Sequence, residues 1–120
     1  MRFAKEDIGA AERMLKDRSF VSRQICFLAQ QGAEKALKAC LVFLGVEFPK
    51  THDLARLWSM FPKDWNLGPS GDDLDGLAQW AVEPRYPGEF PAATLAEAAE
   101  VVAKARALLE AIERELARHG

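Results

Sequence analysis

Apolar residues recur at helical spacing from the start of the chain. The first group steps by four, three and four residues, which places all its members on one face of an amphipathic helix. The members are Ala4, Ile8, Ala11 and Leu15. A second and longer pattern lies between Ser19, a residue type that caps helix N-termini, and Gly45, a residue type that ends helices. We expect this second helix, of roughly 25 residues, to be the backbone of the fold.

The apolar side of this second helix is Val21, Ile25, Leu28, Ala33, Leu37, Cys40 and Leu44. A linker over residues 46–50 separates it from a short third helix, for which we predict Thr51 as the N-cap and Pro62 as the end. Ser70 could cap a fourth helix that carries Leu74, Leu77 and Ala81. Three prolines prevent regular helix over residues 83–91.

The last helix has the clearest pattern. Thr94-Leu95-Ala96-Glu97 has the form of a capping box, in which the first and last side chains satisfy each other's backbone N–H groups. The apolar stripe that follows is Leu95, Ala98, Val102, Ala105, Leu109, Ile112 and Leu116, widened by Val101 and Leu108. This width is normal for a bundle helix, and it also led us to expect a homodimer built on the long helices.

The fold class that follows is all-α, an antiparallel up-and-down bundle of four to five helices. With 120 residues, the chain is expected to be one domain, residues 1–120. Its longest strictly apolar run, residues 39–44, is far shorter than the ~20 residues that span a membrane, so no membrane association is expected. The charged first residues do not resemble a signal peptide, and we expect the protein in the cytoplasm.

Charge is unevenly divided along the chain. The net charge is −2, which excludes a strongly basic nucleic-acid coat but not a local basic patch. Residues 1–50 hold nine Lys/Arg and six Asp/Glu, whereas residues 51–120 hold seven and twelve. Such a division suits self-association or an oppositely charged partner, although solvated helix faces would also produce it.

The sequence offers little to a metal or a cofactor. Cys26 and Cys40 lie fourteen positions apart on the second predicted helix, roughly 21 Å, and cannot pair within the chain. We expect both to be buried thiols. The chain has no zinc-type cluster and no nucleotide-binding glycine loop, so we expect no metal and no cofactor.

Three places carry candidate chemistry. The polar side of the second helix holds Gln31, Lys35 and Lys38 on one face, where amides and amines could hold a phosphate or a base. Free backbone N–H groups at Thr51-His52-Asp53 favour anions. In the proline-rich loop, Arg85 could bind phosphate and Tyr86 could stack on a base. Each place also has a purely structural interpretation. The helix face would be solvated, the Thr51-His52-Asp53 segment would be a helix cap with a packed histidine, and the proline-rich loop would be a buried turn.

These three places occur in an order that resembles the HEPN (higher eukaryote and prokaryote nucleotide-binding) domain family. The resemblance rests on Phe27-Leu28-Ala29-Gln30-Gln31-Gly32-Ala33-Glu34-Lys35-Ala36-Leu37-Lys38-Ala39, on Pro49-Lys50-Thr51-His52-Asp53-Leu54 and on Arg85-Tyr86-Pro87. It implies a helical bundle that dimerises and binds nucleotides or RNA. It also implies pairing with a small nucleotidyltransferase, in some members as a toxin with its antitoxin.

The ribonuclease branch of the family uses an Arg-x4–6-His motif near the start of the last helix. Arg114 and His119 match this spacing formally, but at the chain end and about 140° apart on a helix. Arg85 occupies the expected position of the catalytic arginine, yet positions 90–92 are Phe, Pro and Ala. We therefore expect a binding module first. The alternatives are a metal-independent endoribonuclease and a structural partner subunit without a ligand.

Overall fold

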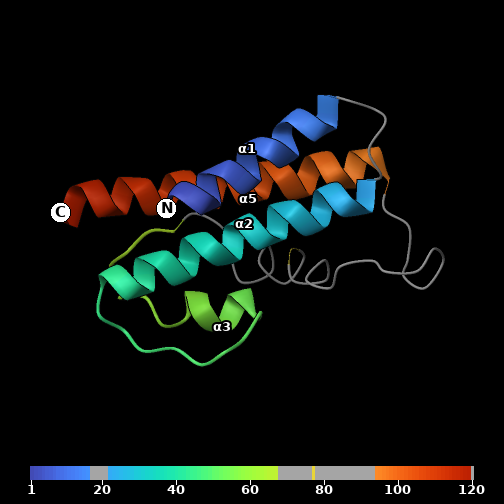
Figure 1. Cartoon of the computed structure of the whole chain (residues 1–120). Coiled ribbons are helices and arrows are strands. Elements are labelled where there is room, and N and C mark those ends of the chain that lie inside the picture. Colours follow the sequence, from blue (N-terminus) through green and yellow to red (C-terminus); the bar gives the residue numbers. More distant parts are fainter. Residues whose placement is uncertain (17–21, 68–76, 78–93, 120) are drawn as a thin grey trace.

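Four helices define the computed structural model, which describes residues 1–16, 22–67, 77 and 94–119. They are α1 (Arg2–Lys16), α2 (Ser22–Phe43), α3 (Leu54–Trp58) and α5 (Leu95–His119). In Figure 1, α1 runs antiparallel to both α2 and α5, and α3 lies against the C-terminal half of α2. The described residues contain no strand, so the expected all-α bundle is confirmed.

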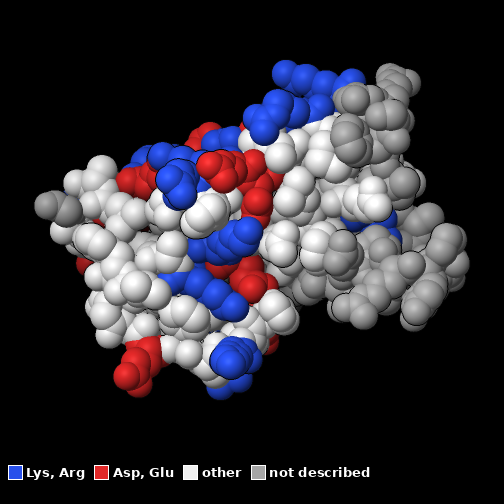
Figure 2. Space-filling view, in the orientation of Figure 1, with Lys and Arg blue, Asp and Glu red and all other residues white. Residues whose placement is uncertain are grey.

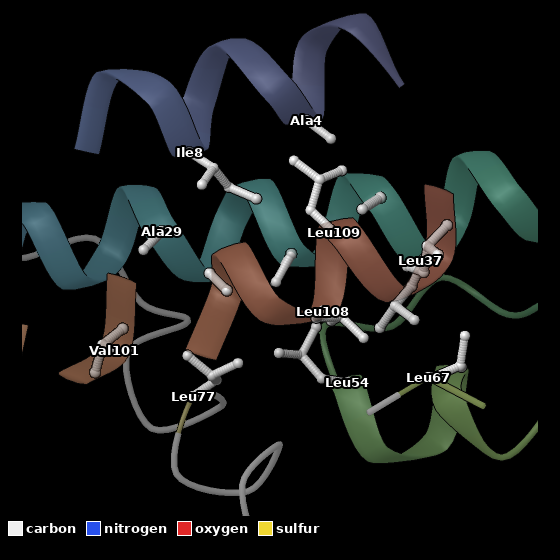
Figure 3. Packing of buried hydrophobic residues seen from close by; sticks show 14 of the residues in the cluster. Ala4, Ile8, Ala29, Leu37, Leu54, Leu67, Leu77, Val101, Leu108 and Leu109 are labelled. Carbon is white, nitrogen blue, oxygen red and sulfur yellow. The ribbon is translucent and has the colours of Figure 1, made fainter. Parts of the chain in front are cut away.

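The core forms where the apolar faces of the helices meet. Ile8 of α1, Leu37 of α2 and Leu109 of α5 have no exposed surface. In Figure 3, Ala4 and Ile8 point from α1 toward the other long helices, while Leu54 and Leu67 close the opposite side. The apolar stripe of α5 packs across its full width within one chain, because Val101, Leu108 and Ala111 are all buried there. The stripe alone therefore does not require a second copy.

Two predicted helix ends are present, the stop at Gly45 after α2 and the capping box at Thr94 before α5. Gly45 follows α2 with a positive φ of 73°, and its N–H bonds to the Val42 carbonyl while Val46 N–H bonds to the Leu41 carbonyl, each at 3.0 Å. These two bonds are a Schellman motif, which needs the left-handed conformation that glycine adopts without steric cost. At the start of α5, Thr94 Oγ1 accepts from Glu97 N–H at 3.0 Å and Glu97 Oε1 accepts from Thr94 N–H at 3.1 Å. The capping box is confirmed.

The short third helix differs from its prediction at both ends. Its N-cap is Asp53 and not Thr51, because the Asp53 carboxylate accepts from Arg56 N–H at 3.2 Å. Thr51 Oγ1 instead accepts from Asp53 N–H at 3.1 Å, one step before the cap. The α-helix ends at Trp58, well before Pro62, and the chain continues in a tighter turn in which Phe61 N–H bonds to the Trp58 carbonyl. Pro62 is therefore not the end of α3: a proline disrupts the interior of a helix, but the helix can end several residues before it.

The two N-terminal helices approach closely at Gly32. A Cβ built there would lie 2.6 Å from Ile8 Cγ1 and 3.2 Å from Ile8 N, so only glycine fits this crossing without movement. Two ion pairs join α1 to α5: Lys5 contacts Glu113 at 3.2 Å, and Arg106 donates to Glu12 through two hydrogen bonds of 2.9 and 2.5 Å. The Arg106 guanidinium lowers the pKa of Glu12.

The remaining expectations that bear on the fold concern membranes, thiols and the fourth predicted helix. No helix in the described part of the chain is both long and apolar enough to cross a bilayer. Cys26 and Cys40 are buried and unpaired, as predicted, and burial raises the pKa of each thiol to about 11. Ser19, Ser70 and most of the fourth predicted helix lie outside the described residues; Leu77 is described and fully buried.

Candidate functional site

A buried carboxylate organises the polar face of α2. The side chain of Glu34 is only 10% exposed, and three side chains converge on it. Lys38 Nζ donates to Glu34 Oε2 at 3.0 Å, His52 Nδ1 lies 2.8 and 3.0 Å from the two carboxylate oxygens, and Gln30 Nε2 donates to Oε1 at 3.4 Å. We call Gln30, Glu34, Lys38 and His52 the Glu34 cluster. It joins α2 to the segment that leads into α3.

The Glu34 cluster fixes how His52 is presented. Because a carboxylate can only accept, Nδ1 carries the hydrogen, which leaves Nε2 as the second ring nitrogen, open to a ligand. The side chain is 74% exposed despite the buried partner of its Nδ1. The histidine is thus neither a packed core residue nor a loose surface residue. It is an oriented imidazole at the protein surface, beside the Lys38 ammonium group.

Lys35 follows Glu34 directly in the sequence but belongs to a different contact. Its Nζ lies 2.7 Å from Asp7 Oδ2 of α1. The close helix crossing at Gly32 makes this contact possible, because it brings Asp7 Cβ and the backbone nitrogen of Ile8 up against α2. Gln31 lies half-buried on the polar face of the same helix, one turn before Lys35. The two lysines on the polar face of α2 therefore pair with different carboxylates: Lys38 with Glu34, and Lys35 with Asp7.

The two lysines meet again at an open groove between α1 and α2. The groove has a volume of about 480 Å³ and is lined by Met1, Phe3, Ala4, Lys35, Lys38 and Ala39. We call it the Lys35–Lys38 groove. Figure 2 shows basic and acidic side chains alternating where α1 and α2 run side by side, next to uncharged surface. Lys35 and Lys38, which their spacing places on one face of the helix, thus both line this groove.

The other predicted site residues are placed differently. Thr51 and Asp53 lie beside His52, but both are used in the turn and the cap at the start of α3. The five-residue length of α3 leaves little helix dipole to attract an anion. Arg85 and Tyr86 lie outside the described residues.

The formal ribonuclease pair at the C-terminus sits in a structural cluster. His119 Nε2 lies 3.1 Å from Glu115 Oε2, and its ring stacks on Trp65 with centroids 4.9 Å apart. Glu115 is buried and also accepts from the backbone N–H of Asn66 at 3.1 Å. Arg114 is exposed, one position before Glu115. His119 therefore has a packing role, through its contacts with Glu115 and Trp65. Among the described residues, no group of three or more histidine, cysteine or acidic side chains could hold a metal ion.

Sequence reasoning missed three participants. Glu34 was expected only as the i,i+4 partner of Lys38, whereas it also holds His52, eighteen positions away. Nothing in the local sequence pattern of α1 marks Asp7 or Phe3 as a site residue. Their roles depend on the crossing of α1 over α2.

The comparison with protein families accounts for nearly the whole chain. Residues 1–115 match the HEPN domain. The chain belongs to the HEPN family. The match ends at Glu115, so His119 lies beyond it. No curated protein matches the sequence.

Two solved structures resemble this HEPN chain over almost their full length. TT1696 from Thermus thermophilus superimposes with a TM-score of 0.78 at 26% identity, covering 94% of this chain and 92% of that one. ST0689, described as an archaeal HEPN homologue, gives a TM-score of 0.69 at 25% identity, with 95% and 92% covered. The long helices and their packing are therefore features of the HEPN fold.

Proposed function

We propose that this HEPN protein binds a nucleotide or RNA through its phosphates, using Lys35, Lys38 and His52. The observation that carries the proposal is the Lys35–Lys38 groove, an open and mostly apolar surface lined by two lysines, one of which pairs with the carboxylate that also orients His52. Phosphate is best held by several donors at once, and each charge-assisted hydrogen bond contributes roughly 1.5–3 kcal/mol. From sequence, Arg85 and Tyr86 belong to the same proposal.

The carboxylates beside these donors limit how the surface works. Glu34 and Asp7 each neutralise one lysine, so the surface is a set of positioned donors and not a strongly positive patch. A phosphate that binds here shares or displaces these contacts. Affinity should therefore depend on individual donors and fall with added salt, because phosphate contacts release counterions.

A titration with ADP, inorganic pyrophosphate and a short RNA tests the proposal. Lys38→Ala should weaken binding about tenfold or more, since 1.4 kcal/mol is a factor of ten. Lys63→Ala, which removes an exposed lysine outside the groove, is the matched control. If Lys35→Ala and Lys38→Ala bind every probe like the wild type while circular dichroism shows intact helices, the phosphate site is misplaced. No binding at all would favour the purely structural subunit.

We further propose that the protein is a homodimer in the cytoplasm and the partner subunit of a small nucleotidyltransferase in a two-component, toxin–antitoxin-like system. Family membership supports this proposal. Light scattering at micromolar concentration should give twice the chain mass. Co-expression with a nucleotidyltransferase encoded next to this chain should yield one complex on size exclusion. A monomer in the first experiment, or separate elution in the second, would refute the corresponding part.

The endoribonuclease alternative makes a different prediction for the C-terminal pair. If the Arg114–His119 spacing is coincidental, His119→Ala leaves any RNA cleavage by the purified protein unchanged. Robust cleavage that is lost in both Arg114→Ala and His119→Ala would replace the binding-module proposal with the ribonuclease. Thermal melts of both variants are needed beside the assay, because His119 also contacts buried Glu115.

A further inference from the structure

The Lys35–Lys38 groove has an aromatic wall as well as a charged one. Phe3 lines it from α1 and is 60% exposed, although the residue that follows it, Ala4, is buried in the core. A phenylalanine ring that is mostly in water contributes little to folding. Its position in the same groove as two lysines therefore calls for a different explanation.

The face of the Phe3 ring already makes a contact with a planar charged group, the guanidinium of Arg2. The guanidinium carbon of Arg2 lies 4.9 Å from its centroid, within the range of a cation–π contact. A flat, polarisable ring system can stack on the same kind of face, and aromatic side chains bind bases in this way regardless of base identity. Arg2 adds a further positive charge at this end of the groove.

The size of the groove limits what can fill it. At about 480 Å³ it lies within the range of small-molecule sites, and its mostly apolar lining includes one aromatic residue and two lysines whose ammonium groups pair with Asp7 and Glu34. An extended RNA strand would need a series of stacking platforms and a longer basic track. An apolar peptide offers no negative charge for which Lys35 and Lys38 could exchange their present carboxylate partners. A single nucleotide matches both walls at once.

We propose that the Lys35–Lys38 groove binds one nucleotide, with the base stacked on Phe3 and the phosphates held by Lys35 and Lys38. This inference rests on the proposed function and adds the class of ligand and the residue that recognises its ring. The base recognition is independent of base identity, since stacking on Phe3 uses the π-face and not the hydrogen-bonding edge.

Titrations of the wild type and point variants with ADP and inorganic pyrophosphate test the assignment. ADP carries a ring and phosphates, whereas inorganic pyrophosphate carries phosphates alone. Phe3→Ala should weaken ADP binding at least about fivefold and leave pyrophosphate binding unchanged, because base stacking is worth that factor or more. Phe3→Trp should restore ADP binding. Phe43→Ala is the matched control, since Phe43 is 63% exposed but lies outside the groove.

The outcomes separate this inference from the function on which it rests. If Lys38→Ala weakens both probes but Phe3→Ala binds ADP like Phe43→Ala, the phosphate site stands and the Phe3 assignment is overturned. A selective loss of ADP in Tyr86→Ala and not in Phe3→Ala also overturns it. A 5′-phosphorylated hexaribonucleotide completes the series: if it binds tighter than ADP with the same dependence on Phe3, the nucleotide is an RNA end and not a free one.

Discussion

Replacing Gly32 by alanine sets two opposing effects against each other, and the structure decides between them. In an open helix the substitution would stabilise the protein by about 1 kcal/mol, because alanine has the higher helix propensity. Here the new methyl would lie 2.6 Å from Ile8 Cγ1 and 3.2 Å from both Ile8 N and Asp7 Cβ. Ile8 has no exposed surface, so it cannot swing aside, and α1 itself has to move.

The magnitude follows from these two terms. Overpacking a filled core costs about 1–3 kcal/mol, and the contact with backbone as well as side chain favours the upper part of that range. After subtraction of the propensity gain, we expect Gly32→Ala to lower the free energy of unfolding by about 1–2 kcal/mol. For a chain of this size the melting temperature should fall by roughly 4–8 °C.

Gly9→Ala makes the same chemical change in α1 and should have the opposite sign. Its new Cβ would meet only the end of the flexible Arg13 side chain, at 3.5 Å, so the helix propensity term remains alone. Urea unfolding followed by circular dichroism measures both variants against the wild type. Equal or greater stability of Gly32→Ala, with no gain in Gly9→Ala, would show that the helix crossing is not as tight as described.

Three further predictions concern burial and charge. The thiols of Cys26 and Cys40, with pKa values near 11 and almost no exposure, should react with a disulfide reagent at pH 8 only as fast as the protein unfolds; prompt labelling of the native protein would contradict their burial. Glu115→Ala should cost about 1.5–3 kcal/mol in urea unfolding, because it leaves the Asn66 N–H and the His119 ring without their acceptor; a loss within error would show that water replaces the carboxylate. The lowered pKa of Glu12 means that its bond to Arg106 stabilises the protein above the unfolded-state pKa and is lost as the pH falls through the lower, folded-state value. Since both side chains are about a third exposed, Arg106→Ala should cost no more than about 1 kcal/mol at pH 7 and progressively less as the pH is lowered, by thermal melts over the acid range.

Local signals in the sequence predicted the helices and several of their ends correctly. The stop at Gly45 and the capping box at Thr94 depend only on residues within a few positions of each other, and both are present as predicted. The cap at the third helix shows the limit of such signals. Thr51 and Asp53 are both good capping residues two positions apart, and the choice between them depends on where Leu54 and Leu57 can enter the core.

The candidate site was predictable only in part, for the same kind of reason. The pairing of Glu34 with Lys38 follows from their spacing on one helix, and the family motif pointed to the same face of α2. The partner of Lys35 could not be read from α2 at all. It depends on Gly32, which lets α1 come close enough for Asp7 to reach across.

By itself, then, the sequence determined the elements and the family, because helical periodicity, caps and a contiguous motif involve neighbours along the chain. Only the tertiary structure decided which carboxylate pairs with each lysine and that Glu34 orients His52. It also decided that Phe3 and Lys35 line the same groove. It also gave His119 a packing role against Trp65. These contacts join residues far apart in sequence. Their geometry is set by the angle and depth at which helices cross, and side-chain packing at the crossing, not local propensity, determines both.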